Sequence, residues 1–394
     1  MAARRRTSPD GEPAVVRQEA HATGHGRIYM PGRDLNFHLK APRSLVVIVA
    51  VAAVLAGGYW AGVTWVLPWL APTYKTHFLI DATADTAAGG PGVIAASLKQ
   101  VLANSGDGDA LALRSFGGEC GADGNTKQLV GFGTGNRQEI AEAAAGVPGG
   151  GQATLLKGLV QAVEDFSAPL SLRAKQVNRV IVVTRHGTDA CDTDTAFVER
   201  EIRQRIAGAG LAVEFRLIGF QVPEGEREGL SRLATASGAP APLFADTPAR
   251  LRAGLDWYAN VEPVIRGADQ LIRVLNRPID QVNAAYRALE AGRIDAAERT
   301  LDQAEKPGPG AELEDLRGRA KTPAAQDIYR RAAGLRVRQG HVIAAAERLL
   351  GAARSGSPPD FAAYIQVADT YNDEVDALER ALKALRATSP AAPR

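Results

Sequence analysis

The chain has 394 residues, of which 45% are hydrophobic and 23% are charged, and its formal net charge is +2. This length provides for two to three domains with an ample core, and this composition excludes a wholly disordered chain. The small net charge gives no indication of nucleic-acid binding.

Charge is unevenly distributed along the chain. Residues 1–43 contain eight Lys or Arg and four Asp or Glu, a net charge of +4, which leaves about −2 for the remainder. The same segment is rich in Arg, Gly, Pro and His and has no apolar periodicity. We therefore predict that residues 1–43 are mostly disordered.

The next segment is free of charge. Residues 44–74 contain no Asp, Glu, Lys or Arg, and the apolar run Leu45–Leu67 is longer than the roughly 20 residues that cross a bilayer. We predict a transmembrane helix over residues 44–70. Because basic residues precede the span and only Lys75 follows it closely, the positive-inside rule places residues 1–43 in the cytoplasm. A single-pass plasma-membrane protein, with the bulk of the chain extracytoplasmic, is therefore expected.

Two cysteines, Cys120 and Cys191, lie on the side that is predicted to be oxidising. They form no CxxC motif and have no histidine pair beside them to indicate zinc. A single disulfide is the economical interpretation, and two unrelated thiols are the alternative.

Short apolar runs alternate with amphipathic segments over residues 76–261. The predicted strands are His77–Ala82, Ala110–Phe116, Lys127–Phe132, Arg179–Thr184, Ala212–Phe220 and Pro242–Ala245. The predicted helices are Gly92–Asn104, Arg137–Ala145, Leu155–Phe166, Ala196–Ala209 and Glu226–Ser237. This alternation predicts a doubly wound, mostly parallel α/β sheet, with ligands at the carboxyl ends of its strands.

Residues 262–388 are rich in Ala, Arg, Glu and Leu and have helical spacing throughout, which predicts an all-α domain. Ala291–Ala304 and Gln339–Ala352 share small residues, leucines and alanines at matching positions. Each resembles the unit of tetratricopeptide repeats, although the offset of 48 residues departs from the usual one. A plain bundle of helical hairpins is the favoured alternative, and self-association through this domain is a possible role.

The loop Asp81-Ala82-Thr83-Ala84-Asp85 resembles the D-x-S-x-S loop that opens a von Willebrand factor A (vWA) domain. Thr154, at the start of a predicted helix, matches the threonine of that family's second loop. The strand ending at Thr184, followed by Arg185-His186-Gly187, aligns with a strand that ends in Thr-Asp-Gly or Ser-Asp-Gly. Bacterial members often carry cysteines where Cys120 and Cys191 stand. The resemblance covers roughly residues 76–250 and implies a Rossmann-like vWA fold.

In that family these loops hold a divalent cation, Mg²⁺ or Mn²⁺, but this chain departs from the pattern. Asp85 replaces a hydroxyl, and His186 replaces the expected aspartate, beside Arg185. One interpretation keeps a cation on Asp81, Thr83, Asp85 and Thr154. The favoured one is a cation-free site, in which Arg185 forms a charge-assisted pair with the carboxylates. The nearby Asp189, Asp192 and Asp194 are outer ligands or, more simply, a solvated acidic loop.

The resemblance implies a non-catalytic adhesion or assembly module that binds a protein at the strand-end face around Asp81, Thr154 and His186. No nucleophile elbow, zinc-protease motif or phosphate-binding loop is present. The Ala-, Arg- and Gly-rich composition suggests a GC-rich bacterial genome, and hence a cell-envelope setting for a membrane-anchored chain. Two alternatives stay open: a structural, self-assembling envelope component with an inert vWA domain, and a metal-dependent hydrolase.

Overall fold

The computed structural model describes residues 74–83, 90–166, 176–192, 194–208, 212–304 and 310–390. Its sheet has six strands in the order β3-β2-β1-β4-β5-β6, and only β3 runs antiparallel to its neighbour. The strands are β1 (Tyr74–Asp81), β2 (Ala110–Phe116), β3 (Thr126–Gly133), β4 (Val177–Thr184), β5 (Val213–Phe220) and β6 (Leu243–Ala245).

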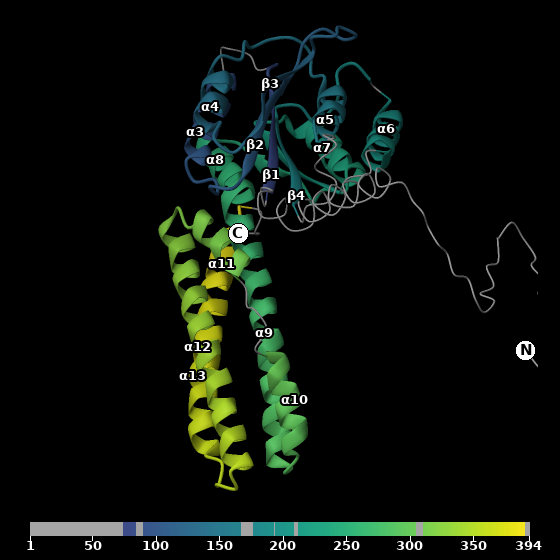
Figure 1. Ribbon diagram of the computed structural model, residues 1–394. Coiled ribbons are helices and arrows are strands. Elements are labelled where there is room, and N and C mark those ends of the chain that lie inside the picture. Colours follow the sequence, from purple (N-terminus) through teal and green to yellow (C-terminus); the bar gives the residue numbers. More distant parts are fainter. Residues whose placement is uncertain are drawn as a thin grey trace, which may run out of the picture. The chain divides into compact units, whose positions relative to one another are not determined.

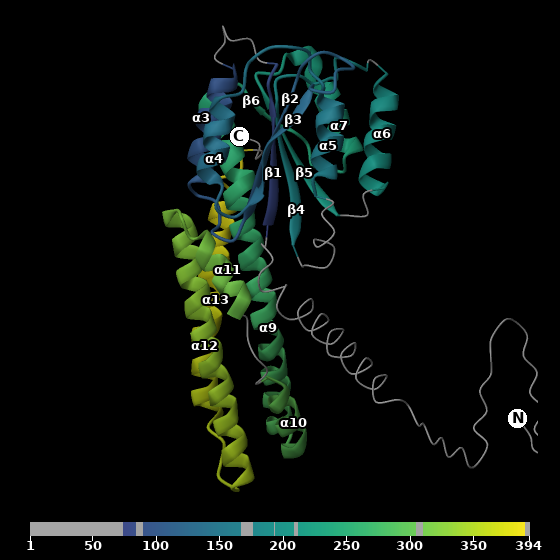
Figure 2. The same cartoon turned by 45° about the horizontal axis from the view of Figure 1, so that its top comes forward.

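Helices cover both faces of this sheet (Figures 1 and 2). One layer contains α3 (Gly90–Leu102), α4 (Arg137–Ala145) and α8 (Pro248–Asp256). The other contains α5 (Leu155–Glu164), α6 (Thr195–Gly208) and α7 (Glu224–Ala236). The predicted doubly wound, mostly parallel α/β fold is confirmed for the described residues.

Burial explains the strand sequences. β1 and β2 are buried along their whole length, and β4 is buried from its second residue on, so each has an apolar stretch at its centre. The polar residues of these three strands lie mainly toward the strand ends. β3 lies at the sheet edge, and all of its residues except Val130 are partly or fully exposed. The predicted ranges of β2 and α4 match the structure residue for residue. Helix α8 was not predicted, because its nine residues have no strong apolar periodicity and follow a strand of only three residues.

The predicted segments 1–43 and 44–70 lie outside the described residues. Within the described ranges, no helix combines the length and the apolar composition that a membrane span needs.

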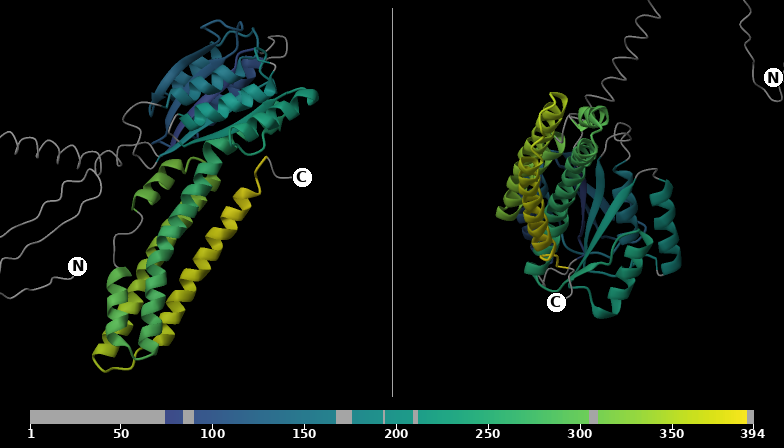
Figure 3. Two further views of the ribbon diagram at one scale, coloured as in Figure 1. Left: turned by 90° about the vertical axis from the view of Figure 1, so that its right-hand side faces the viewer. Right: turned by 90° about the horizontal axis from the view of Figure 1, so that it is seen from below.

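The carboxyl-terminal region is all-helical, as predicted. It contains α9 (Glu262–Glu290), α10 (Ile294–Ala304), α11 (Gly310–Arg319), α12 (Pro323–Arg354) and α13 (Phe361–Arg386). The long helices α9, α12 and α13 run side by side, and α10 packs against α9 (Figure 3). A separate apolar core, drawn from all five helices, holds them together.

The two segments that echo each other in sequence differ in structure. In the first, Gly292 has a positive φ of 69° and forms the turn between α9 and α10. In the second, Gly340 lies inside the 32-residue helix α12, which continues without a turn. The two segments therefore share residues that pack helices together, without sharing a helix-turn-helix unit. The arrangement is that of a bundle of helices, the alternative to tetratricopeptide repeats.

A π-helical turn, Trp257–Val261, joins α8 to α9 and exposes one carbonyl to a buried arginine. The residue that would donate to the Tyr258 carbonyl in a π-turn is Pro263, which has no N–H. The guanidinium of Arg179, fully buried on β4, donates to this carbonyl instead. The turn that starts the helical region is thus fixed to the central sheet.

A second buried arginine, Arg319, also connects the helical region to the sheet. Arg319, at the end of α11, forms a bidentate pair with Asp109, which precedes β2, at 2.7 and 3.0 Å. Its guanidinium also lies 4.3 Å from the centroid of the Tyr74 ring, at the start of β1. Both members of the ion pair are almost completely buried. Arg319 also pairs with Asp315 at 3.0 Å, whereas within the described ranges Arg319 is the ion-pair partner that compensates the charge of Asp109.

His77, in the middle of β1, is a packing residue. The ring is fully buried between Phe132 and Phe166, with its Nε2 atom 3.7 Å from a carboxylate oxygen of Asp165. Burial lowers the pKa of His77 to about 4, although the charge of Asp165 opposes the shift.

We predict that Arg319→Met lowers the free energy of unfolding by about 3–5 kcal/mol, because Asp109 loses the partner of its buried charge. Chemical denaturation measures the loss. The control is Asp107→Asn, which removes the more exposed pair with Lys321 and should change stability by less than about 1 kcal/mol. Equal effects of the two substitutions would contradict the inferred importance of the buried pair.

We also predict that stability falls as the pH drops from about 6.5 to about 4. The unfolded chain binds a proton on His77 in this window and the folded chain does not, so acid favours unfolding, by up to about 3 kcal/mol. Denaturation of His77→Gln at several pH values should show a flatter profile in the same window. An unchanged profile would show that His77 does not cause this dependence.

Candidate functional site

The carboxylate of Asp81, at the end of β1, is held by donors of the chain itself. Asp81 is 1% exposed. The backbone N–H of Thr83 donates to one carboxylate oxygen at 2.7 Å, and the Thr83 hydroxyl donates to the same oxygen. The backbone N–H of Arg185 donates to the other oxygen at 2.8 Å. Asp81 thus joins the end of β1 to the turn that follows β4.

Thr184 completes this turn. Its hydroxyl accepts a hydrogen bond from the backbone N–H of His186 at 3.0 Å and lies 2.9 Å from the carbonyl oxygen of the same residue. The hydroxyl is also 3.3 Å from Asp81, but its single proton serves only one acceptor at a time. The shorter contact favours the His186 carbonyl, so Thr184 mainly fixes the turn that presents His186.

The residues that the sequence grouped as one site are only partly brought together. Asp81 and Thr83 are in direct contact, and Arg185 reaches Asp81 through its backbone. Among the described residues, no bond joins the Arg185 guanidinium to Asp81, so the predicted side-chain pair is not found there. The other predicted carboxylate, Asp85, lies outside the described residues.

Thr154 has a structural role at the start of α5. Its hydroxyl donates to the carbonyl of Asn125 at 2.6 Å and accepts from the backbone N–H of Gly117 at 3.0 Å. These bonds hold the loop that follows β2. Within the described residues, its bonds do not include Asp81.

Glycines let three loops meet at this edge of the sheet. Gly151 has a φ of 86°, and a Cβ atom at this position would lie 2.6 Å from the Cα atom of Gly118. Gly118 and Gln152 exchange two backbone hydrogen bonds, at 2.8 and 3.1 Å, while the Gly150 N–H donates to the Ala82 carbonyl at 2.8 Å. Close backbone contacts therefore hold the described parts of these three loops together at the strand-end face.

Asp189 stabilises this face from within. One of its carboxylate oxygens accepts from the backbone N–H of Leu156 at 2.7 Å, so it caps α5 from a distant loop. The other oxygen accepts from the N–H groups of Cys191 and Asp192. Asp194 similarly caps α6 through two backbone N–H groups. These two aspartates are structural caps.

The predicted disulfide between Cys120 and Cys191 is confirmed. Their Cα atoms lie 5.3 Å apart, and the bond joins the loop after β2 to the loop after β4. Both cysteines are exposed, so the disulfide lies at the surface of the candidate face.

His186 presents a partly exposed imidazole at this surface, with 38% of its side chain accessible. Its Nδ1 atom lies 3.7 Å from a carboxylate oxygen of Glu226, in the first turn of α7. The same oxygen accepts from the Gly187 N–H at 2.9 Å. A Cβ atom at Gly187 would lie 1.8 Å from the Glu226 carbonyl, so only glycine allows this approach.

The family resemblance implies a divalent cation here, and the described residues do not fit one. Mg²⁺ needs about six oxygen ligands in a near-octahedral arrangement. Both oxygens of Asp81 and the hydroxyl of Thr154 already form bonds within the protein, and Arg185 and His186 stand where a carboxylate is expected. Nowhere in the described ranges do three or more His, Cys, Asp or Glu side chains form a group suited to a metal.

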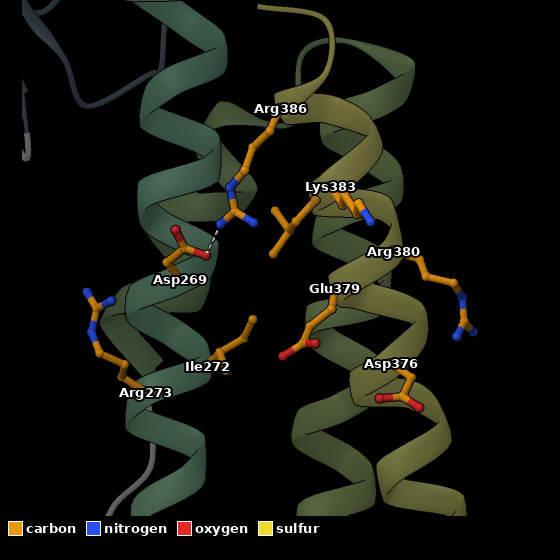
Figure 4. Close-up of a pocket in the computed structure, with 9 residues that line it drawn as sticks. Asp269, Ile272, Arg273, Asp376, Glu379, Arg380, Lys383 and Arg386 are labelled. Atoms are coloured by element: carbon orange, nitrogen blue, oxygen red, sulfur yellow. Dashed lines mark hydrogen bonds and ion pairs between the residues drawn. The ribbon is translucent and has the colours of Figure 1, made fainter. Parts of the chain in front are cut away.

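A hollow lies in the helical region, between α9 and α13 (Figure 4). It measures about 670 Å³, and the ion pair of Asp269 with Arg386 crosses one end at 2.6 Å. Ile272 and Leu382 supply apolar surface, and the other lining residues are charged. Acidic residues precede basic ones along α13: Asp376, Glu379, Arg380, Lys383, Arg386.

Several residues of the site were missed by sequence reasoning. Asn125 and Gly117 hold Thr154, and Glu226 approaches His186 from a different helix. The pair Gly117-Gly118 directly after a buried strand was a usable signal for a tight turn. The contacts of Asn125 and Glu226 are long-range, and no local sequence signal identifies them.

We predict that Asp81→Asn lowers the free energy of unfolding by about 1–3 kcal/mol. The new amide group places donor hydrogens against the N–H of either Thr83 or Arg185, which leaves a buried donor unpaired. Urea denaturation provides the measurement, with the exposed Asp123→Asn as a control that should change stability by less than about 0.5 kcal/mol. A neutral Asp81→Asn would mean that the carboxylate does not join the two loops.

No protein-family model matches the chain, and no curated protein matches it. Three solved structures illustrate what it is similar to. The pilus adhesin SpaC of Lactobacillus rhamnosus GG is 16% identical over 47% of this chain and 29% of its own, with a TM-score of 0.38. A von Willebrand factor type A protein of Catenulispora acidiphila is 19% identical over 47% of this chain and 42% of its own (TM-score 0.36). The vWF domain of the type V pili tip protein Mfa5 of Porphyromonas gingivalis is 12% identical over 48% of this chain and 94% of its own (TM-score 0.36).

Proposed function

We propose that this chain is a membrane-anchored, extracytoplasmic vWA-type module that binds a protein partner at its strand-end face without a cation and without catalysis. The observation that carries the proposal is the bonding of Asp81. Both oxygens of this carboxylate accept hydrogen bonds from loops of the chain, so its role is to shape the surface.

A rigid surface favours binding. Loops that are fixed before a partner arrives lose little conformational freedom on association, which improves affinity. The backbone bridge between Gly118 and Gln152, the disulfide and the caps supplied by Asp189 fix these loops in advance. The face that they present includes the half-exposed His186 and Arg185.

The vWA assignment is supported by the positions of the matching residues. Asp81, the last residue of β1, is in contact with Thr83. Thr154 precedes α5, and Gly187 follows β4 in the close turn against α7. All of them lie at the carboxyl-terminal edge of the sheet, where α/β folds bind ligands.

Membrane anchoring is supported by the charge-free residues 44–74 and by the arrangement of charges around them. The disulfide is consistent with an extracytoplasmic, oxidising location. A bacterial cell envelope is the proposed setting.

A second candidate function is structural self-assembly through the helical region. It is favoured by the hollow between α9 and α13, where acidic Asp376 and Glu379 precede basic Arg380 and Lys383 along one helix. Two copies of α13 in antiparallel orientation would place opposite charges together.

The two functions are separated by photo-crosslinking of the full chain in membranes. A benzophenone amino acid replaces His186 on the strand-end face or Val337 on α12, which is 60% exposed. We predict adducts with a different protein from position 186 and none from position 337. Self-adducts alone would support the structural role, and the absence of adducts at position 186 would contradict the proposed function.

A further inference from the structure

Two neighbouring hollows lie on the α5–α6–α7 side of the strand-end face. The first measures about 180 Å³. Its apolar surface comes from Leu155 on α5, Val198 on α6 and Leu233 on α7, which are largely buried. Small-molecule sites typically measure about 300–1,000 Å³, so this hollow suits a single side chain.

The second hollow measures about 340 Å³ and lies beside the disulfide. Leu156, Val160 and Phe197 line it together with Cys191. Phe197, at the start of α6, is 41% exposed and adds apolar surface to this hollow. The two hollows share Leu156, Asp189 and Asp192, so they lie next to each other across the loop after β4.

The rim of the two hollows is acidic. Four carboxylates line them, against two basic side chains: Asp189, Asp192, Glu199 and Glu201, with Lys157 and Arg232. Glu199 and Glu201 each have an arginine partner one turn along α6. Among the described residues, the Asp192 carboxylate has no Lys or Arg partner, and it accepts one hydrogen bond, from the Asp194 N–H at 3.0 Å. An uncompensated carboxylate therefore lies between two apolar hollows.

We propose that this surface binds a segment of a partner protein in which two apolar side chains flank a lysine or arginine. One apolar side chain enters each hollow, and the basic side chain pairs with Asp192 between them. This inference rests on the proposed protein-binding function and gives the partner its chemistry. A bound cation would favour a partner segment with acidic side chains. The four carboxylates around these hollows would repel such a segment and favour a basic one.

The geometry of the rim supports a preformed site. Asp189 fixes the shared loop through three backbone N–H groups, and the disulfide fixes its far end. The hollows therefore exist before the partner arrives, and less ordering free energy is lost on binding.

The test measures the anisotropy of fluorescent peptides added to the full chain in detergent. The probes are Ser-Gly-Phe-Lys-Lys-Leu-Gly-Ser, the same peptide with Glu-Glu in place of Lys-Lys, and a version with Ser in place of Phe and Leu. We expect the first peptide to bind at least tenfold more tightly than either of the others, and its affinity to fall as salt is added.

Two substitutions locate the binding. Asp192→Asn removes the charge but keeps an acceptor for the Asp194 N–H, and Phe197→Ser changes an exposed side chain, so neither should prevent folding. Each should weaken the first peptide at least fivefold. Glu379→Gln, which removes a charge in the hollow between α9 and α13 (Figure 4), is the matched control and should change nothing.

Equal binding of the lysine and glutamate peptides, or full binding to both variants, would overturn the inference. Failure of the lysine peptide to bind, with partner adducts still formed at position 186, would overturn the inference and leave the protein-binding function in place. Loss of those adducts as well would overturn both.

Discussion

A charge that is taken out of water must be compensated nearby, and this requirement determines the structure at both edges of the sheet. At the carboxyl-terminal edge, Asp81 is compensated by backbone N–H groups and a hydroxyl. At the opposite edge, Arg319 is paired with Asp109, and Arg179 lies 3.7 and 3.9 Å from Glu214 and Glu262. Each compensation joins segments that are distant in sequence.

The two edges of the sheet therefore differ in what they contact. The ring of Tyr74, the first described residue, lies 4.3 Å from the Arg319 guanidinium and 5.0 Å from that of Arg179, so the amino-terminal edge joins β1 to the helical region. Within the described ranges, ion pairs from the helical region to Asp107, Asp109 and Glu214 lie at this edge. The carboxyl-terminal edge carries the disulfide, the turns after β2 and β4, and the two hollows at which we propose that a partner binds.

The fold was largely predictable because it depends on local patterns. Continuous apolar runs marked β2 and β4, and the two cysteines marked their disulfide. The site was less predictable, because its contacts depend on how loops pack. The sequence indicated that the side chain of Arg185 pairs with Asp81, but the backbone N–H of Arg185 makes the contact. Thr154, predicted to lie beside Asp81, bonds to the loop after β2 instead. The matching segments around Gly292 and Gly340 share helix-packing residues, yet only one contains a turn.

The central claim is that the chain's own hydrogen bonds take the place of a cation at Asp81. Titration of the purified full chain with Mn²⁺, followed by electron paramagnetic resonance of the free ion, tests it most directly. The account predicts no saturable binding at millimolar Mn²⁺ and no difference between the natural chain and Asp81→Ala. Binding of one ion per chain that disappears in Asp81→Ala would contradict it.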